Sequence, residues 1–219
     1  MSDALFTQLL DVAAGLALVC AFVPLWRRGL VAVIRALAVQ GATLAAVALL
    51  LGIRRSDPEL LGVAVLVFAL KAVVIPGLLV RIVTASTEAR DAEPLVNVPA
   101  SLLAGAALTL LAYAATRDVV ALDPGLEVRA VPVGVAVVLV GFFVLVSRRK
   151  AVSQVVGFLI LDNGIALVAF LATAGLPLVV ELGASLDLLL AVLVLQVLAA
   201  RMRTKFGAMD LDQLQELRD

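Results

Sequence analysis

The 219-residue chain is 63% hydrophobic and only 16% charged, and its mean hydropathy of +1.16 lies outside the range of ordinary water-soluble domains. Its 17 basic and 17 acidic residues balance, so no excess of positive charge points to nucleic acid. A single cysteine, Cys20, and the absence of histidine exclude an intramolecular disulfide and an iron–sulfur cluster held by this chain alone, and they argue against a transition-metal site.

Apolar segments long enough to cross a bilayer follow one another along the chain, since a spanning helix needs about 20 residues. They lie at residues 4–26, 30–53, 59–82, 97–117, 128–147, 151–175 and 178–202, and turn residues such as Asp123-Pro124-Gly125 separate them. We therefore predict an all-α polytopic membrane protein with about seven transmembrane helices.

We predict a single transmembrane domain over residues 1–203. It has an N-terminal four-helix part (1–127) and a C-terminal three-helix part (128–203), and residues 204–219 form a cytoplasmic tail. The orientation follows from the basic residues, which are retained preferentially on the cytoplasmic side. Most of them lie in the first, third and fifth loops and at the C-terminus, which predicts an outside N-terminus and a cytoplasmic C-terminus.

Small residues predict where helices pack closely. Gly134 and Gly141 in the fifth segment, and Gly157 and Gly164 in the sixth, are each seven residues apart and lie on nearly one side of their helices. We expect close helix contact at these positions.

Ionisable residues inside the apolar segments are the candidate functional groups. A charge at mid-bilayer costs about 2.5–3.5 kcal/mol on insertion scales, and it is tolerated where it faces protein or water. Asp11, Lys71, Asp162 and Asp187 lie inside segments, and Glu181 lies nearer the end of the seventh. We predict a proton relay of Asp162, Asp187, Lys71 and Glu181. The signal of Asp11, a single acid in the terminal helix, is weaker.

Each of these residues also has a structural interpretation. Asp162 would then bond a neighbouring helix, and Lys71 would serve only as the counter-ion of one of the acids. Pro76 follows Lys71 closely, and its missing N–H leaves the carbonyl of Ala72 without its helical donor, which predicts a kinked and locally polar site. The amides of Asn163, Gln40 and Gln196 are predicted to hold helix contacts or water molecules.

The order of features in the last 90 or so residues resembles a known family. Ser147-Arg-Arg-Lys-Ala151, then Gly157-Phe-Leu-Ile-Leu-Asp-Asn-Gly164, then a segment with a mid-membrane acid and a basic end, is similar to the NuoK-type subunit of respiratory complex I. With four more N-terminal segments, the Lys71–Pro76 run and the junction at Glu181, the whole length resembles hydrogenase-4 component E (HyfE).

The resemblance implies a non-catalytic subunit in the membrane arm of a group 4 nickel–iron hydrogenase or formate hydrogenlyase-type complex, in a bacterial or archaeal cytoplasmic membrane. The chain would carry no cofactor, and the nickel–iron centre and iron–sulfur clusters would lie on partner subunits. Its partners would be antiporter-like and NuoH-like membrane subunits and, through them, hydrophilic hydrogenase subunits. Asp162 matches the first relay acid of the NuoK type, where that family usually has glutamate, and Asp187 matches the second.

Two other functions stay open at this point. A multi-subunit cation/proton antiporter of the Mrp type, or a NADH dehydrogenase-like complex, also contains a NuoK-like subunit, although the Mrp subunit is usually shorter than this chain. A structural scaffold whose buried charges are paired and inactive is the third interpretation.

Overall fold

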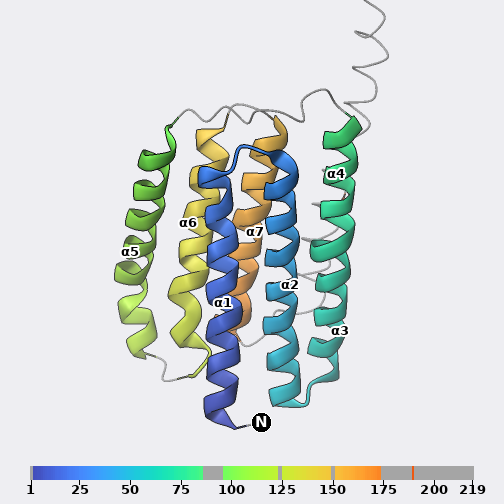
Figure 1. Cartoon of the computed structure of the whole chain (residues 1–219). Coiled ribbons are helices and arrows are strands. Elements are labelled where there is room, and N and C mark those ends of the chain that lie inside the picture. Colours follow the sequence, from blue (N-terminus) through green and yellow to red (C-terminus); the bar gives the residue numbers. More distant parts are fainter. Residues whose placement is uncertain (1, 86–95, 123–124, 149–150, 174–188, 190–219) are drawn as a thin grey trace, which may run out of the picture.

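A computed structural model describes residues 2–85, 96–122, 125–148, 151–173 and 189. Within these residues every regular element is a helix, which confirms the predicted all-α class. Six helices are long and apolar enough to cross a membrane, and they correspond to the first six predicted segments (Figure 1). The seventh predicted segment, 178–202, and the tail, 204–219, lie outside the described residues.

Successive long helices alternate in direction along the chain, and α3, η1 and α4 together form one of them (Figure 1). They are α1 (Asp3–Trp26), α2 (Leu30–Arg55), α3 (Pro58–Val67), the π-helix η1 (Phe68–Val74), α4 (Ile75–Ala85), α5 (Val98–Leu122), the short η3 (Val128–Ala130), α6 (Val131–Ser147) and α7 (Ala151–Thr173). The largest difference from the prediction is the end of α5, which was expected at residue 117. Arg117 and Asp118 end the apolar run but not the helix, since a helix that has reached water tolerates charged residues.

The predicted break after α2 is built from turn and capping residues. Ser56 adopts a left-handed conformation with φ of 54° and ends α2. The Asp57 side chain then accepts hydrogen bonds from the backbone N–H groups of Glu59 and Leu60, and Pro58 occupies the first turn of α3. Two helices are thereby joined by a tight connection.

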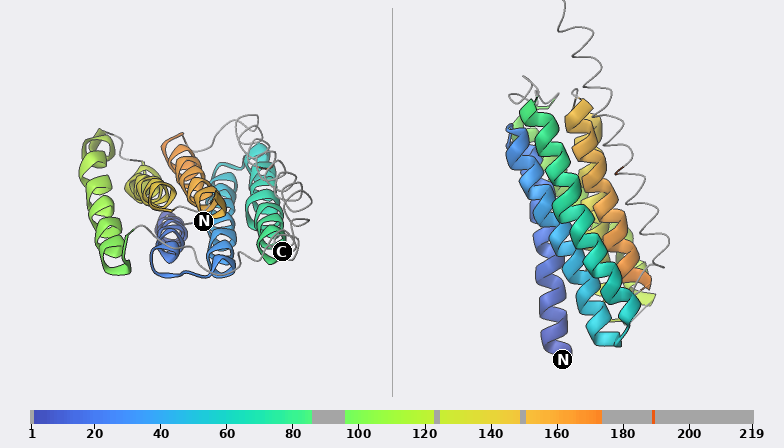
Figure 2. Two further views of the ribbon diagram at one scale, coloured as in Figure 1. Left: turned by 90° about the horizontal axis from the view of Figure 1, so that it is seen from above. Right: turned by 90° about the vertical axis from the view of Figure 1, so that its right-hand side faces the viewer.

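Four helices form the centre of the bundle, which is seen end-on in Figure 2 (left). α1 packs against α2 and α6, and α7 packs against α6 and α2. α5 flanks α1 and α6 at one edge, and α3, η1 and α4 flank α2 at the other. Buried residues of α1, α2 and α3 share one apolar core with residues of α6 and α7, so packing crosses the predicted boundary at residue 127.

The glycines bring α6 and α7 into backbone contact, as predicted. A Cβ atom at Gly141 would lie 2.4 Å from the backbone nitrogen of Leu161, and one at Gly157 would lie 2.5 Å from that of Leu145. Gly164 meets the backbone nitrogen of Val138 in the same way, at 2.6 Å. Because Leu161 precedes Asp162, this contact fixes the level of Asp162 along α7.

Candidate functional site

An ion pair between a buried lysine and a partly buried aspartate joins η1 to α7. The Lys71 Nζ atom lies 2.7 Å from Asp162 Oδ2, and the two residues are 91 positions apart in the chain. The Lys71 side chain is only 3% exposed and that of Asp162 is 17% exposed. The structure therefore brings together two of the four predicted relay residues.

The backbone around Lys71 is a π-helix and not a regular α-helix. The N–H of Ile75 donates to the carbonyl of Leu70, five residues earlier, just before Pro76. Proline lacks an N–H and crowds the preceding turn, so a widened turn accommodates it within a continuous helix. Single π-turns in helices are frequent at functional sites. The predicted distortion near Lys71 is thus present as a wider turn.

Gly41 of α2 lies directly against the backbone of Lys71. A Cβ atom at Gly41 would be 2.4 Å from the Lys71 carbonyl oxygen and 2.9 Å from the nitrogen of Ala72. Sequence analysis did not include this glycine in the site. A signal was available, because glycine inside a helix costs about 1 kcal/mol relative to alanine and therefore suggests a packing reason.

Two buried amides extend the polar site towards α1. Asn163 Nδ2 donates to Gln40 Oε1 at 3.1 Å, and Gln40 Nε2 donates to the carbonyl of Ala17 at 3.0 Å. Thr43 Oγ1 donates to the Gln40 carbonyl at 2.7 Å, within α2. α7 therefore directs the acid of Asp162 to η1 and the neighbouring amide of Asn163 to α2.

Four further residues were singled out from the sequence: Asp11, Glu181, Asp187 and Gln196. Asp187, Glu181 and Gln196 lie outside the described residues. Asp11 is exposed on α1. In the part of the chain that the structure describes, no group of three or more His, Cys, Asp or Glu residues is placed to hold a metal ion. The Lys71–Asp162 pair can hold and exchange a proton, and its carboxylate can bind a small cation.

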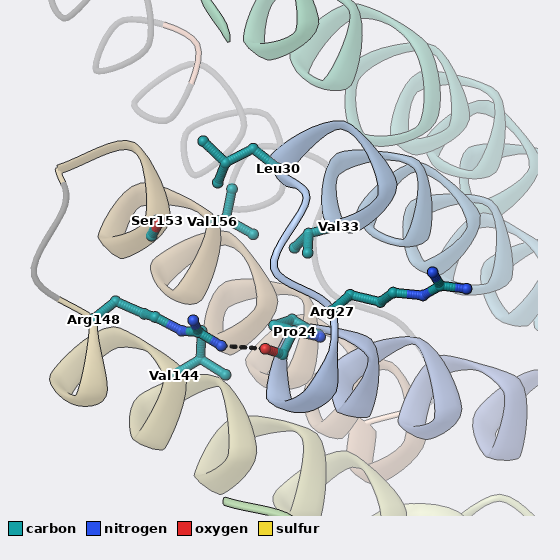
Figure 3. Close-up of a pocket in the computed structure, with 8 residues that line it drawn as sticks. All are labelled: Pro24, Arg27, Leu30, Val33, Val144, Arg148, Ser153 and Val156. Atoms are coloured by element: carbon teal, nitrogen blue, oxygen red, sulfur yellow. Dashed lines mark hydrogen bonds between the residues drawn. The ribbon is translucent and has the colours of Figure 1, made fainter. Parts of the chain in front are cut away.

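A second buried cation lies where α1 and α6 end and α7 begins (Figure 3). Arg148, which belongs to the Ser147–Ala151 run noted in the sequence, donates from Nη2 to the carbonyl of Pro24 in the last turn of α1. Such carbonyls lack helical donors, and a cation favours this end of the helix dipole. Burial lowers the pKa of the Arg148 guanidinium from its usual value, and the charge of Arg28 lowers it further. The adjoining cavity holds about 10 Å³, the size of one water molecule.

Replacing Arg148 with methionine should lower the free energy of unfolding by about 1–3 kcal/mol, because a buried carbonyl loses a charged donor. Arg55→Met is the matched control at the opposite end of α2, where Arg55 is exposed. A surface substitution of this kind changes the free energy of unfolding by less than about 0.5 kcal/mol. Unfolding of both variants in detergent micelles measures the difference, and equal losses would contradict the capping role of Arg148.

Comparison with known proteins identifies relatives of this chain. The uncharacterized protein Rv0085 of Mycobacterium tuberculosis is 55% identical over 220 residues, which cover the whole of both chains. Hydrogenase-4 component E of Escherichia coli K12 is 30% identical over 118 residues, 54% of each chain, and the component E of Shigella flexneri matches to the same extent. The match to these hydrogenase components thus spans about half of their length. No family model matches the chain. No solved structure matches it either.

Proposed function

The chain belongs to the same family as the Mycobacterium tuberculosis protein, and we propose that it is a non-catalytic subunit in the membrane arm of a complex I-like hydrogenase. It would help to couple redox chemistry on other subunits to the movement of protons, or of sodium ions. The observation that carries this proposal is the Lys71–Asp162 pair, which is buried among helices long enough to span a membrane. The similarity to hydrogenase-4 component E supports the same assignment.

In the proposed mechanism the pair stores and releases a proton. An ammonium and a carboxylate 2.7 Å apart stabilise each other in their charged forms, and a proton moved from Nζ to Oδ2 leaves both groups neutral. A charge that approaches from a neighbouring subunit would favour one of these states over the other. Asp187 and Glu181 are the proposed further stations of the relay.

The redox chemistry would take place elsewhere in the complex. We propose that the nickel–iron centre and iron–sulfur clusters lie on partner subunits and that antiporter-like and NuoH-like subunits adjoin this chain. The complex would lie in a bacterial or archaeal cytoplasmic membrane with the C-terminus of the chain in the cytoplasm. Co-purification of a nickel–iron large subunit in mild detergent would support this assignment, whereas antiporter subunits alone would indicate the Mrp-type function.

Replacing Asp162 with asparagine should abolish proton uptake by vesicles that contain the assembled complex, because an amide does not accept a proton at neutral pH. Asp162→Glu should keep part of the uptake. Asp118→Asn, on the exposed side of α5, is the matched control and should behave as the wild type. Co-purification of the other subunits verifies assembly, and unchanged proton uptake in assembled Asp162→Asn complexes would refute the proposed function.

A further inference from the structure

Two adjacent residues of α2 contact the chain segments that carry Lys71 and Asp162. Gly41 lies against the peptide group between Lys71 and Ala72, at 2.4 Å from the Lys71 carbonyl oxygen if a Cβ is added. Gln40 binds the side chain of Asn163, the residue that follows Asp162. One turn of α2 therefore contacts both the backbone of Lys71 and the residue next to Asp162.

Neither contact is easily adjusted. The contact at Gly41 is between two backbones, so no change of rotamer relieves or lengthens it. The amide of Gln40 is bonded at both ends, since Oε1 accepts from Asn163 and Nε2 donates to Ala17 of α1. Gln40 is also only 1% exposed, so water does not compete for its amide.

The packing of the helices makes α2 the common support. Among the described elements, η1 and α7 both pack extensively on α2, whereas contact between η1 and α7 themselves is slight. The separation between Lys71 Nζ and Asp162 Oδ2 is therefore set mainly through α2. A change at the position where α2 holds α7 should alter that separation.

We propose that Gln40 and Gly41 are positioning residues that set the geometry of the ion pair, with Gln40 acting through Asn163 and Gly41 through the Lys71 backbone. The contacts of Gln40 and Gly41 by themselves support an effect on the distance between Lys71 Nζ and Asp162 Oδ2. An effect on ion movement rests in addition on the proposed function. Because Gln40 also binds the carbonyl of Ala17, the position of α1 also affects the geometry of the ion pair.

The test measures the pair directly in the full chain in liposomes, by solid-state NMR of the dipolar contact between Lys71 ¹⁵Nζ and Asp162 ¹³Cγ. We expect a strong contact in the wild type and a contact at least about threefold weaker in Gln40→Met and in Asn163→Leu. The contact in the double variant should be no weaker than in Gln40→Met, because that substitution already removes the hydrogen bond between the two side chains. Thr116→Val removes a buried hydrogen bond of the same kind in α5, which takes no part in the pair, and should leave the contact intact.

An unchanged contact in Gln40→Met or in Asn163→Leu would overturn the proposal, and so would a wild type without the contact. If Gln40→Met fails to fold, Asn163→Leu tests the same hydrogen bond by a substitution in α7. In the assembled complex Gln40→Met should slow proton uptake about tenfold. A weakened contact with normal proton uptake in Gln40→Met would contradict the proposed function but support the positioning role. An unchanged contact in Gln40→Met, together with loss of uptake in Asp162→Asn, would contradict the positioning role but support the proposed function.

Discussion

Replacing Asp162 with leucine should lower the free energy of unfolding of the isolated chain by about 3–5 kcal/mol, because it removes one partner of a buried ion pair. The Lys71 side chain is 3% exposed, and it lies in a widened helical turn that packs against α2. The ammonium would lose its carboxylate without gaining access to water. Titration with sodium dodecyl sulfate in mixed micelles measures this loss.

The double variant Lys71→Met/Asp162→Leu is the matched control. Apolar residues of similar volume in place of a buried pair are often neutral or stabilising, so most of the loss should be recovered. Such a result would assign the pair to function, since the chain would retain its fold without the two charges. A single Asp162→Leu variant that unfolds like the wild type would show that the pair is not buried as described.

Replacing Gly41 with alanine should lower the free energy of unfolding by about 1–3 kcal/mol, since the added methyl group overpacks a close contact. The new Cβ would lie 2.4 Å from the Lys71 carbonyl oxygen and 2.5 Å from its carbonyl carbon. Both are backbone atoms, so α2 and η1 must move apart. Gly41→Val should be worse, because it adds two more methyl groups at the same place.

Gly62→Ala is the control for this second prediction. Gly62 lies in the neighbouring α3, where an added Cβ meets nothing within 4 Å. Alanine favours a helix over glycine by about 0.5–1 kcal/mol, so this variant should be slightly more stable than the wild type. The two substitutions are chemically identical, and equal effects on unfolding would show that the contact at Gly41 is not tight.

The sequence predicted the helices well because their signal is local. Six apolar segments match six helices, and the breaks carry proline, glycine or charged residues. Lys71 and Asp162 were identifiable for the same reason, since a charge in an apolar helix is conspicuous wherever its neighbours lie. Pro76 indicated that the helix is distorted, but its missing N–H does not specify how the turn rearranges. The π-helix at Phe68–Val74 is known only from the structure.

The membrane class, six of the predicted spans and the charged residues within them therefore follow from the sequence alone, because each depends on the composition of one segment. The tertiary structure decided which of these charges meet. Lys71 pairs with Asp162 because α7 and η1 both pack on α2, and because Gly41 and the glycines of α6 and α7 let backbones approach closely. Close packing depends on the shapes of surfaces distant in the chain, and a segment read alone does not contain them.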